Sequence, residues 1–131
     1  MIVTTDIANI LYKDCKAFGM EVYQSGNIPD EDKELSSERI IIIAKSQSPE
    51  AIWKKGFVEV NLCVPDMDGK ANLIRLQELE RKAQEVLDEV VGEFDGSSYY
   101  YLIDQIGMEA DTELRCHYVN VRLLFQVLNV K

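Results

Sequence analysis

The sequence has few of the residues on which metal sites, disulfide frameworks and most catalytic centres depend. Its 131 residues include one histidine and three cysteines. Cys15, Cys63 and Cys116 are odd in number and widely spaced, which predicts neither a disulfide framework nor a paired-cysteine metal knuckle. We therefore expect three reduced, buried thiols.

Long apolar runs are also missing. No stretch approaches the roughly 18 apolar residues that a membrane-spanning helix needs. The first residues include acids where a secretion signal would be basic. These features predict an intracellular, soluble protein that has no membrane contact.

Positive charge is scarce as well. Lys and Arg number 14 against 23 Asp and Glu, for a formal net charge of -9. A surface that binds duplex DNA by neutralising phosphates is therefore not expected. The simplest interpretation of the excess is that it keeps a small domain soluble and free of nonspecific association.

Motifs that bind phosphate or build a catalytic triad do not occur in the sequence. His117 follows Cys116, but adjacent residues of a strand point to opposite faces of a sheet. Asp66 and Asp68 precede Gly69 as in the opening of a calcium loop, yet the remaining ligands of such a loop are missing. We expect no catalytic, cofactor-binding or metal site, and no enzymatic activity.

Hydrophobic periodicity predicts one α+β domain over residues 1–131, because 47% hydrophobic residues suffice for one core. We expect a single mixed, mainly antiparallel β-sheet packed against two helices, in the order α-β-β-β-α-β-β. Turns are expected at residues 45–56 and 107–111. The expected helices cover residues 4–19 and 71–91, and the expected strands cover residues 21–24, 39–44, 57–64, 99–106 and 117–131.

The last expected strand is the most informative segment. Apolar residues from Val119 to Val127 alternate with a second set that is only partly polar, because it includes Leu124 and Leu128. One face of this strand suits a core, and the other carries apolar side chains that need cover. A partner surface is one candidate for that cover.

Aromatic residues add to this hypothesis. Three consecutive tyrosines, Tyr99 to Tyr101, must place rings on both faces of a strand. We take Tyr99 and Tyr101, with Leu124 and Leu128, as candidates for a subunit interface, and Trp53 as a further anchor. Ordinary cross-strand packing explains the tyrosines equally well, and a small core beneath a loop would explain Trp53.

The segment 26–38 is rich in acids, Ser, Gly and Pro, and is expected to be an exposed, mobile loop. A solvated loop of this kind seldom forms the shaped cleft that paired catalytic carboxylates need. Its carboxylates are instead candidates for contact with a partner or with the lumen of an assembly. They are Asp30, Glu31, Asp32, Glu34 and Glu38.

The order of elements resembles the tail-terminator and tail-completion proteins of long-tailed bacteriophages, with the related head-tail joining proteins. The strand GFVEVNLCVPD leading into the helix ANLIRLQELERKAQEVLDEV, and the final HYVNVRLLFQVLNV, are similar to the strand-helix unit and last strand of that family. The resemblance implies a prophage-encoded structural protein that forms a ring, usually of six subunits, on the tail tube. It also implies head-completion proteins as partners, DNA that at most passes through the ring, and a location in the bacterial cytoplasm during assembly and then in the virion.

Two other classes of function compete with this one. A small acidic binding module, such as an immunity or inhibitor protein, would act as a monomer and use its carboxylates to attract a basic partner. An enzyme is the weakest of the three, because it would depend on the neighbourhood of Cys116 and His117 alone.

Overall fold

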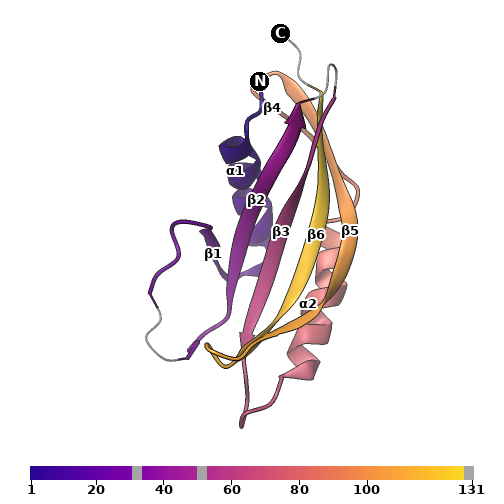
Figure 1. The fold of residues 1–131 in the computed structure, drawn as a ribbon. Helices are drawn as coiled ribbons and strands as arrows, with labels where there is room; N and C mark the ends of the chain where they lie inside the picture. The colour runs from indigo at the N-terminus through magenta and orange to yellow at the C-terminus, as the bar shows by residue number, and fades with distance from the viewer. Residues whose placement is uncertain (31–33, 50–52, 129–131) are drawn as a thin grey trace.

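The computed structural model describes residues 1–30, 34–49 and 53–128 (Figure 1). Within these ranges one six-stranded sheet has the order β1-β2-β3-β6-β5-β4, in which β1 is parallel to β2 and all other neighbours are antiparallel. The predicted α+β class and the mixed, mainly antiparallel sheet are confirmed. The elements are α1 (Thr4–Asp14), a 3-10 turn η1 (Cys15–Phe18), β1 (Glu21–Gln24), β2 (Arg39–Pro49), β3 (Trp53–Pro65), α2 (Leu73–Val86), β4 (Val90–Phe94), β5 (Ser97–Asp111) and β6 (Cys116–Leu128).

Both helices lie on the same face of the sheet, behind it in Figure 1, with α1 against β2 and α2 against β5 and β6. The main core fills the space between helices and sheet, and it takes alternate residues of β6 from Val119 to Val127. We call this side the helix-covered face and the opposite side the open face. The alternation of apolar residues in the last strand therefore predicted its core side correctly.

The first helix forms as its sequence predicts. Ile7, Leu11 and Phe18 recur at helical spacing, and all are buried. The carboxylate of Asp6 accepts a hydrogen bond from the N–H of Val3 at 3.0 Å, which satisfies one free donor at the start of the helix. Gly19 ends the segment in a left-handed conformation (φ 70°), which costs glycine little.

The predicted end of the second helix is wrong. The helix stops at Val86, and residues 90–94 form the extra strand β4, which pairs with the start of β5. Asp95 and Gly96 connect the two strands with φ of 49° and 76°, the double left-handed geometry of a tight hairpin turn that favours Asp-Gly. Gly92 lies within β4. It leaves room for the ring of Tyr99, into which a β-carbon at position 92 would project.

Two predicted turns are strands in the structure. β2 and β3 form a long antiparallel ribbon that extends through most of residues 45–56, with a bulge between Ala44 and Gln47. β5 continues through residues 107–111 with a bulge between Ile103 and Gln105, and the chain turns only at residues 112–115. Polar composition predicted turns at both places. Pairing with a neighbouring strand satisfies the backbone N–H and C=O groups of these polar segments, so strands form there without apolar side chains.

Candidate interaction surface

The open face carries five half-buried apolar or aromatic side chains near one end of the sheet, and we call this set the apolar band. Phe57 of β3, Leu124 of β6 and Leu102 of β5 lie side by side in one row of the sheet. Tyr100 and Leu128 extend the band along β5 and β6. Neither helix contacts this face, so each of these side chains keeps part of its surface exposed to solvent.

Arg122 borders the apolar band. Its guanidinium carbon lies 3.7 Å from the centre of the Phe57 ring, and its Nε lies 3.7 Å from Oδ2 of Asp104. A guanidinium that stacks on an aromatic ring keeps its hydrogen-bonding edge available. The band therefore ends at a positioned positive charge.

The centre of the open face is polar. The side-chain amide of Asn120 donates to Oδ1 of Asn61 at 2.7 Å and to Oε1 of Glu59 at 3.2 Å. Nζ of Lys45 lies 3.2 Å from Oε2 of the same Glu59. This network separates the apolar band from the other end of the face.

At that other end, the open face is covered by part of the segment between β1 and β2. Leu35 is 4% exposed and packs on Ile41, Cys63 and Cys116, and its N–H donates to the carbonyl of Leu114 at 2.8 Å. Burial raises the pKa of Cys63 to about 12 and that of Cys116 to about 11. These thiols stay protonated and unreactive at neutral pH, which agrees with the expected reduced, buried cysteines.

The grouping of the tyrosines with Leu124 and Leu128 is wrong. Tyr101 is completely buried on the helix-covered face, where its hydroxyl donates to Oδ2 of Asp14 at 2.6 Å. Tyr99 lies on the same side and stacks against Phe125. The reason is register, because Tyr99 and Tyr101 pair with core residues of β6, whereas Tyr100 alternates to the open face.

Three members of the apolar band were not predicted from the sequence: Phe57, Tyr100 and Leu102. The alternation of β3 already placed Phe57 opposite to the core residues Val58 and Val60, so its position could have been inferred. For Tyr100 and Leu102 the pairing of β5 with β6 was required. The side chain of Trp53 lies outside the described part of the structure, and its backbone pairs with Leu128.

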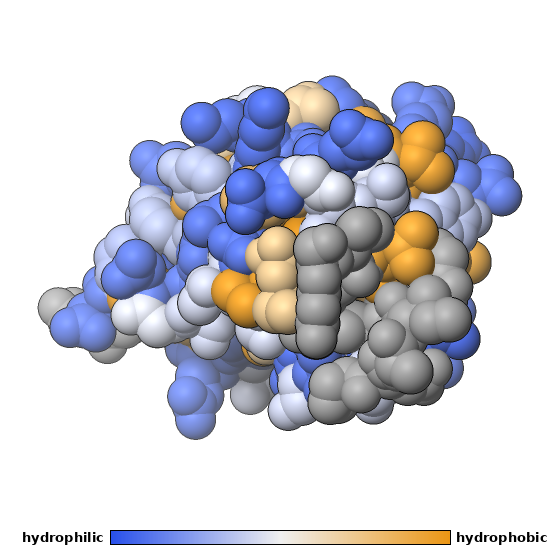
Figure 2. All heavy atoms as spheres, turned by 90° about the horizontal axis from the view of Figure 1, so that it is seen from above, coloured by the Kyte–Doolittle hydropathy of each residue, from blue (hydrophilic) through white to orange (hydrophobic). Residues whose placement is uncertain are grey.

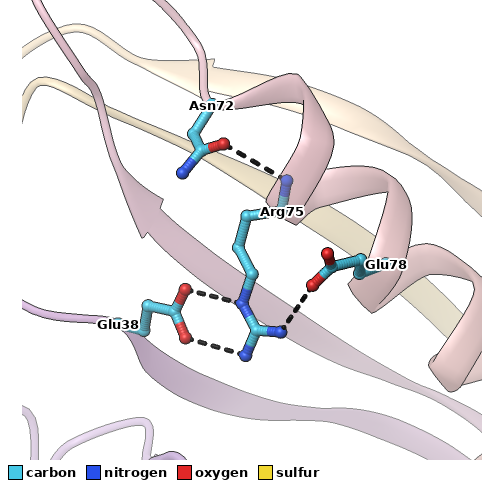
Figure 3. Close-up of polar contacts among 4 residues, drawn as sticks. All are labelled: Glu38, Asn72, Arg75 and Glu78. Carbon is cyan, nitrogen blue, oxygen red and sulfur yellow. Dashed lines mark hydrogen bonds and ion pairs between the residues drawn. The ribbon is translucent and has the colours of Figure 1, made fainter.

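The acidic segment is only partly a free loop. Asp30 and Glu34 are exposed, but Glu38 forms a two-bond ion pair with Arg75 of α2, at 2.7 and 3.0 Å (Figure 3). Arg75 also contacts Glu78 at 3.2 Å, and the hydrogen bonds that the guanidinium donates to Glu38 raise its pKa. Glu38 is therefore a structural anchor and not a carboxylate left free for a partner. Glu31 and Asp32 lie outside the described residues.

His117 lies on the opposite side of its strand from Cys116, as expected for adjacent strand residues. Its Nδ1 is 2.7 Å from Oδ1 of Asp66, beside an open groove of about 590 Å³ that Glu34 and Arg115 also line. A histidine held by a carboxylate can orient a nucleophile, but Cys116 is buried in the cluster around Leu35 and points away. Among the described residues, no group of three or more His, Cys, Asp or Glu side chains could hold a metal ion.

The end of the molecule that carries the N-terminus is shown from above in Figure 2. Apart from the residues drawn in grey, hydrophilic residues dominate this view, and apolar residues form small separate patches.

No helix among residues 1–30, 34–49 and 53–128 is both long and apolar enough to cross a membrane.

Comparison with known proteins shows the fold and nothing further. No protein family model matches the chain, and no curated protein matches it. A solved structure matches over 100% of this chain and 99% of that chain, with a TM-score of 0.61 and 13% sequence identity, and the name of that protein describes no function. At this identity the similarity shows that the two chains share a fold.

Proposed function

We propose that this protein is a subunit of a ring that caps the tail tube of a long-tailed bacteriophage and joins it to the head. The observation that carries the proposal is the apolar band on a sheet face that neither helix covers. Neighbouring subunits contact each other head to tail through this band, and rotation closes the ring. The function is then assembly and not catalysis.

The size of the apolar band sets the strength of the contact. Completing the burial of five half-buried side chains contributes on the order of 1 kcal/mol each. Bringing two proteins together costs roughly 4 to 15 kcal/mol. A pair joined through the band alone is therefore weak. A closed ring has as many contacts as subunits, one more than the open chain of the same length, so assembly depends steeply on protein concentration or on a tail tube that templates it.

The net charge of -9 supports the same role. A ring around DNA has to let the duplex pass without holding it, and a negatively charged lumen repels phosphates. Asp30 and Glu34, which are exposed, are the described carboxylates of the acidic segment that remain candidates for the lumen.

A charge placed in the apolar band tests the proposal. Leu124→Glu puts a carboxylate between Phe57 and Leu102, where a neighbouring subunit would bury it without a partner. Gln84→Glu is the matched control, because it adds the same charge at an exposed position of α2. We expect sedimentation velocity at several concentrations to show assembly of the wild type and of Gln84→Glu, and only monomer for Leu124→Glu.

Circular dichroism of both variants checks that the fold is intact. Assembly by folded Leu124→Glu equal to that of the control would exclude the apolar band as the interface. A strict monomer in all three proteins that binds a basic partner with salt-sensitive affinity would favour the acidic binding module instead.

A further inference from the structure

One edge of the sheet is only half covered. β4 pairs with residues 97–101 of β5, so the remainder of that strand has β6 as its only neighbour in the described sheet. Between Gln105 and Asp111, alternate backbone N–H and C=O groups therefore point away from the sheet. A free edge of this length is a template for one more strand.

Exposed apolar side chains lie beside this edge. Leu73 and Ile74, in the first turn of α2, are 61% and 76% exposed, and Met108 of β5 is 50% exposed. Together they line a groove of about 410 Å³, with Gln77 and Glu80 on its rim. In Figure 1, α2 lies behind and beside the lower part of β5, on the helix-covered side of the free edge.

The two sides of the free edge differ in chemistry. Met108 and Ala110 lie on the helix-covered face because they pair with Val119 and His117, and Met108 lines the apolar groove. Glu109 lies on the open face opposite Tyr118, and it is exposed. An added strand would therefore meet an apolar surface on one side and a carboxylate on the other, in strict alternation.

We propose that the edge of β5 over residues 105–111 binds an extended segment of a partner protein, in which apolar residues alternate with lysine or arginine. Backbone hydrogen bonds to the edge supply the pairing, the groove takes the apolar side chains, and Glu109 on the open face attracts the basic ones. A second copy of this chain does not suit the site, because residues 105–111 include no lysine or arginine that could pair with Glu109 across two such edges. The inference does not depend on ring formation, since the edge and the apolar band are separate surfaces.

Peptide titration followed by amide NMR of the whole protein tests this proposal. The probe is an eight-residue peptide of alternating lysine and valine. The controls are the same peptide with glutamate in place of lysine, and one with proline in place of two central valines. We expect the lysine-valine peptide alone to shift the amides of residues 105–111 and to slow their hydrogen exchange.

A charge reversal adds a second readout. Glu109→Lys should weaken binding of the lysine-valine peptide by roughly threefold or more, whereas Glu85→Lys, at an exposed position of α2, should leave it nearly unchanged. Unchanged edge amides at millimolar peptide, or equal binding of the proline peptide, would overturn the proposal. If Glu109→Lys changes the mass of the protein in solution while leaving peptide binding intact, the occupant is a second copy and the proposal is wrong.

Discussion

Tyr101 joins the sheet to the first helix through a single buried hydroxyl. Its ring stacks on Phe125 with centroids 5.5 Å apart, and its hydroxyl donates to Asp14 at 2.6 Å. Burial raises the pKa of this phenol above its usual range, and the carboxylate of Asp14 raises it further. The phenol therefore stays protonated, and it gives the core a polar contact that only tyrosine can supply.

We expect Tyr101→Phe to lower the free energy of unfolding by about 1 to 2 kcal/mol at pH 7. The ring packing remains, but the hydrogen bond to a charged acceptor is lost. Urea unfolding monitored by circular dichroism measures this value. A change within experimental error would show that the hydroxyl contributes nothing beyond the ring.

The same variant should alter the response to alkali. A tyrosine ionises near pH 10 in the unfolded chain, whereas the pKa of Tyr101 in the folded protein is higher. Its contribution is therefore fully present below about pH 10 and is lost as the pH rises above that value. Stability of Tyr101→Phe should fall less steeply above pH 10 than that of the wild type, although Tyr99, whose pKa is also raised, keeps part of the slope. Equal slopes in both proteins would contradict this assignment.

The sequence could predict that some of the three consecutive tyrosines face the core, but not whether these are Tyr99 and Tyr101 or Tyr100. The alternation of Tyr99, Tyr100 and Tyr101 is local, whereas the choice of face depends on pairing with β6 and on Asp14, 87 residues away. Leu124 and Leu128 were predicted to lie on the opposite face of their strand from its core residues, and they do. The core residues and the two leucines alternate along one strand, so this prediction did not depend on which strands pair.

Individual side-chain contacts hold the segment between β1 and β2 in place. It connects two parallel strands, its described residues form no helix, and Leu35 and Glu38 attach it to the rest of the fold. The two residues are fixed at different places, Leu35 on the open face and Glu38 on the first turn of α2 (Figure 3). The ion pair with Arg75 therefore holds the start of β2 against α2.

Glu38→Gln should destabilise the fold by about 0.5 to 1 kcal/mol, because both partners are partly exposed and solvent screens the pair. Glu78→Gln is the matched control, since Glu78 is 60% exposed and makes a single contact to the same arginine. Urea unfolding at low and high salt measures both variants, and the cost for Glu38→Gln should shrink in high salt. A larger cost for Glu78→Gln would show that the two-bond pair is not the anchor.

Element types were more predictable than their ends. Long periodic segments such as α1 and β6 fell where their pattern placed them, because one face of each is buried along its whole length. β4 was missed because Val90 and Val91 fell at the end of the expected helix over residues 71–91, and the Asp-Gly hairpin signal after them was not recognised as a turn between strands. Arg75 gave no signal in the sequence, since its partner Glu38 is 37 residues away.

For the molecule as a whole, the central feature is a two-layer fold in which both described helices lie on one face of the sheet (Figure 1). The open face combines an apolar band, a polar network and an end covered by Leu35. The free edge of β5 is a second surface with its own chemistry. The two proposals use separate surfaces, so a neighbour of the same kind and a different protein would not compete for one site.

The measurement that tests ring formation most directly is the mass of the wild-type protein in solution. Light scattering coupled to size exclusion, over a wide concentration range, gives that mass, and negative-stain images show the shape of any assembly. We predict a mass that rises with concentration to that of a closed ring, with a central hole wide enough for a DNA duplex. A protein that stays monomeric at the highest concentrations, and also in the presence of tail tubes, would contradict ring formation.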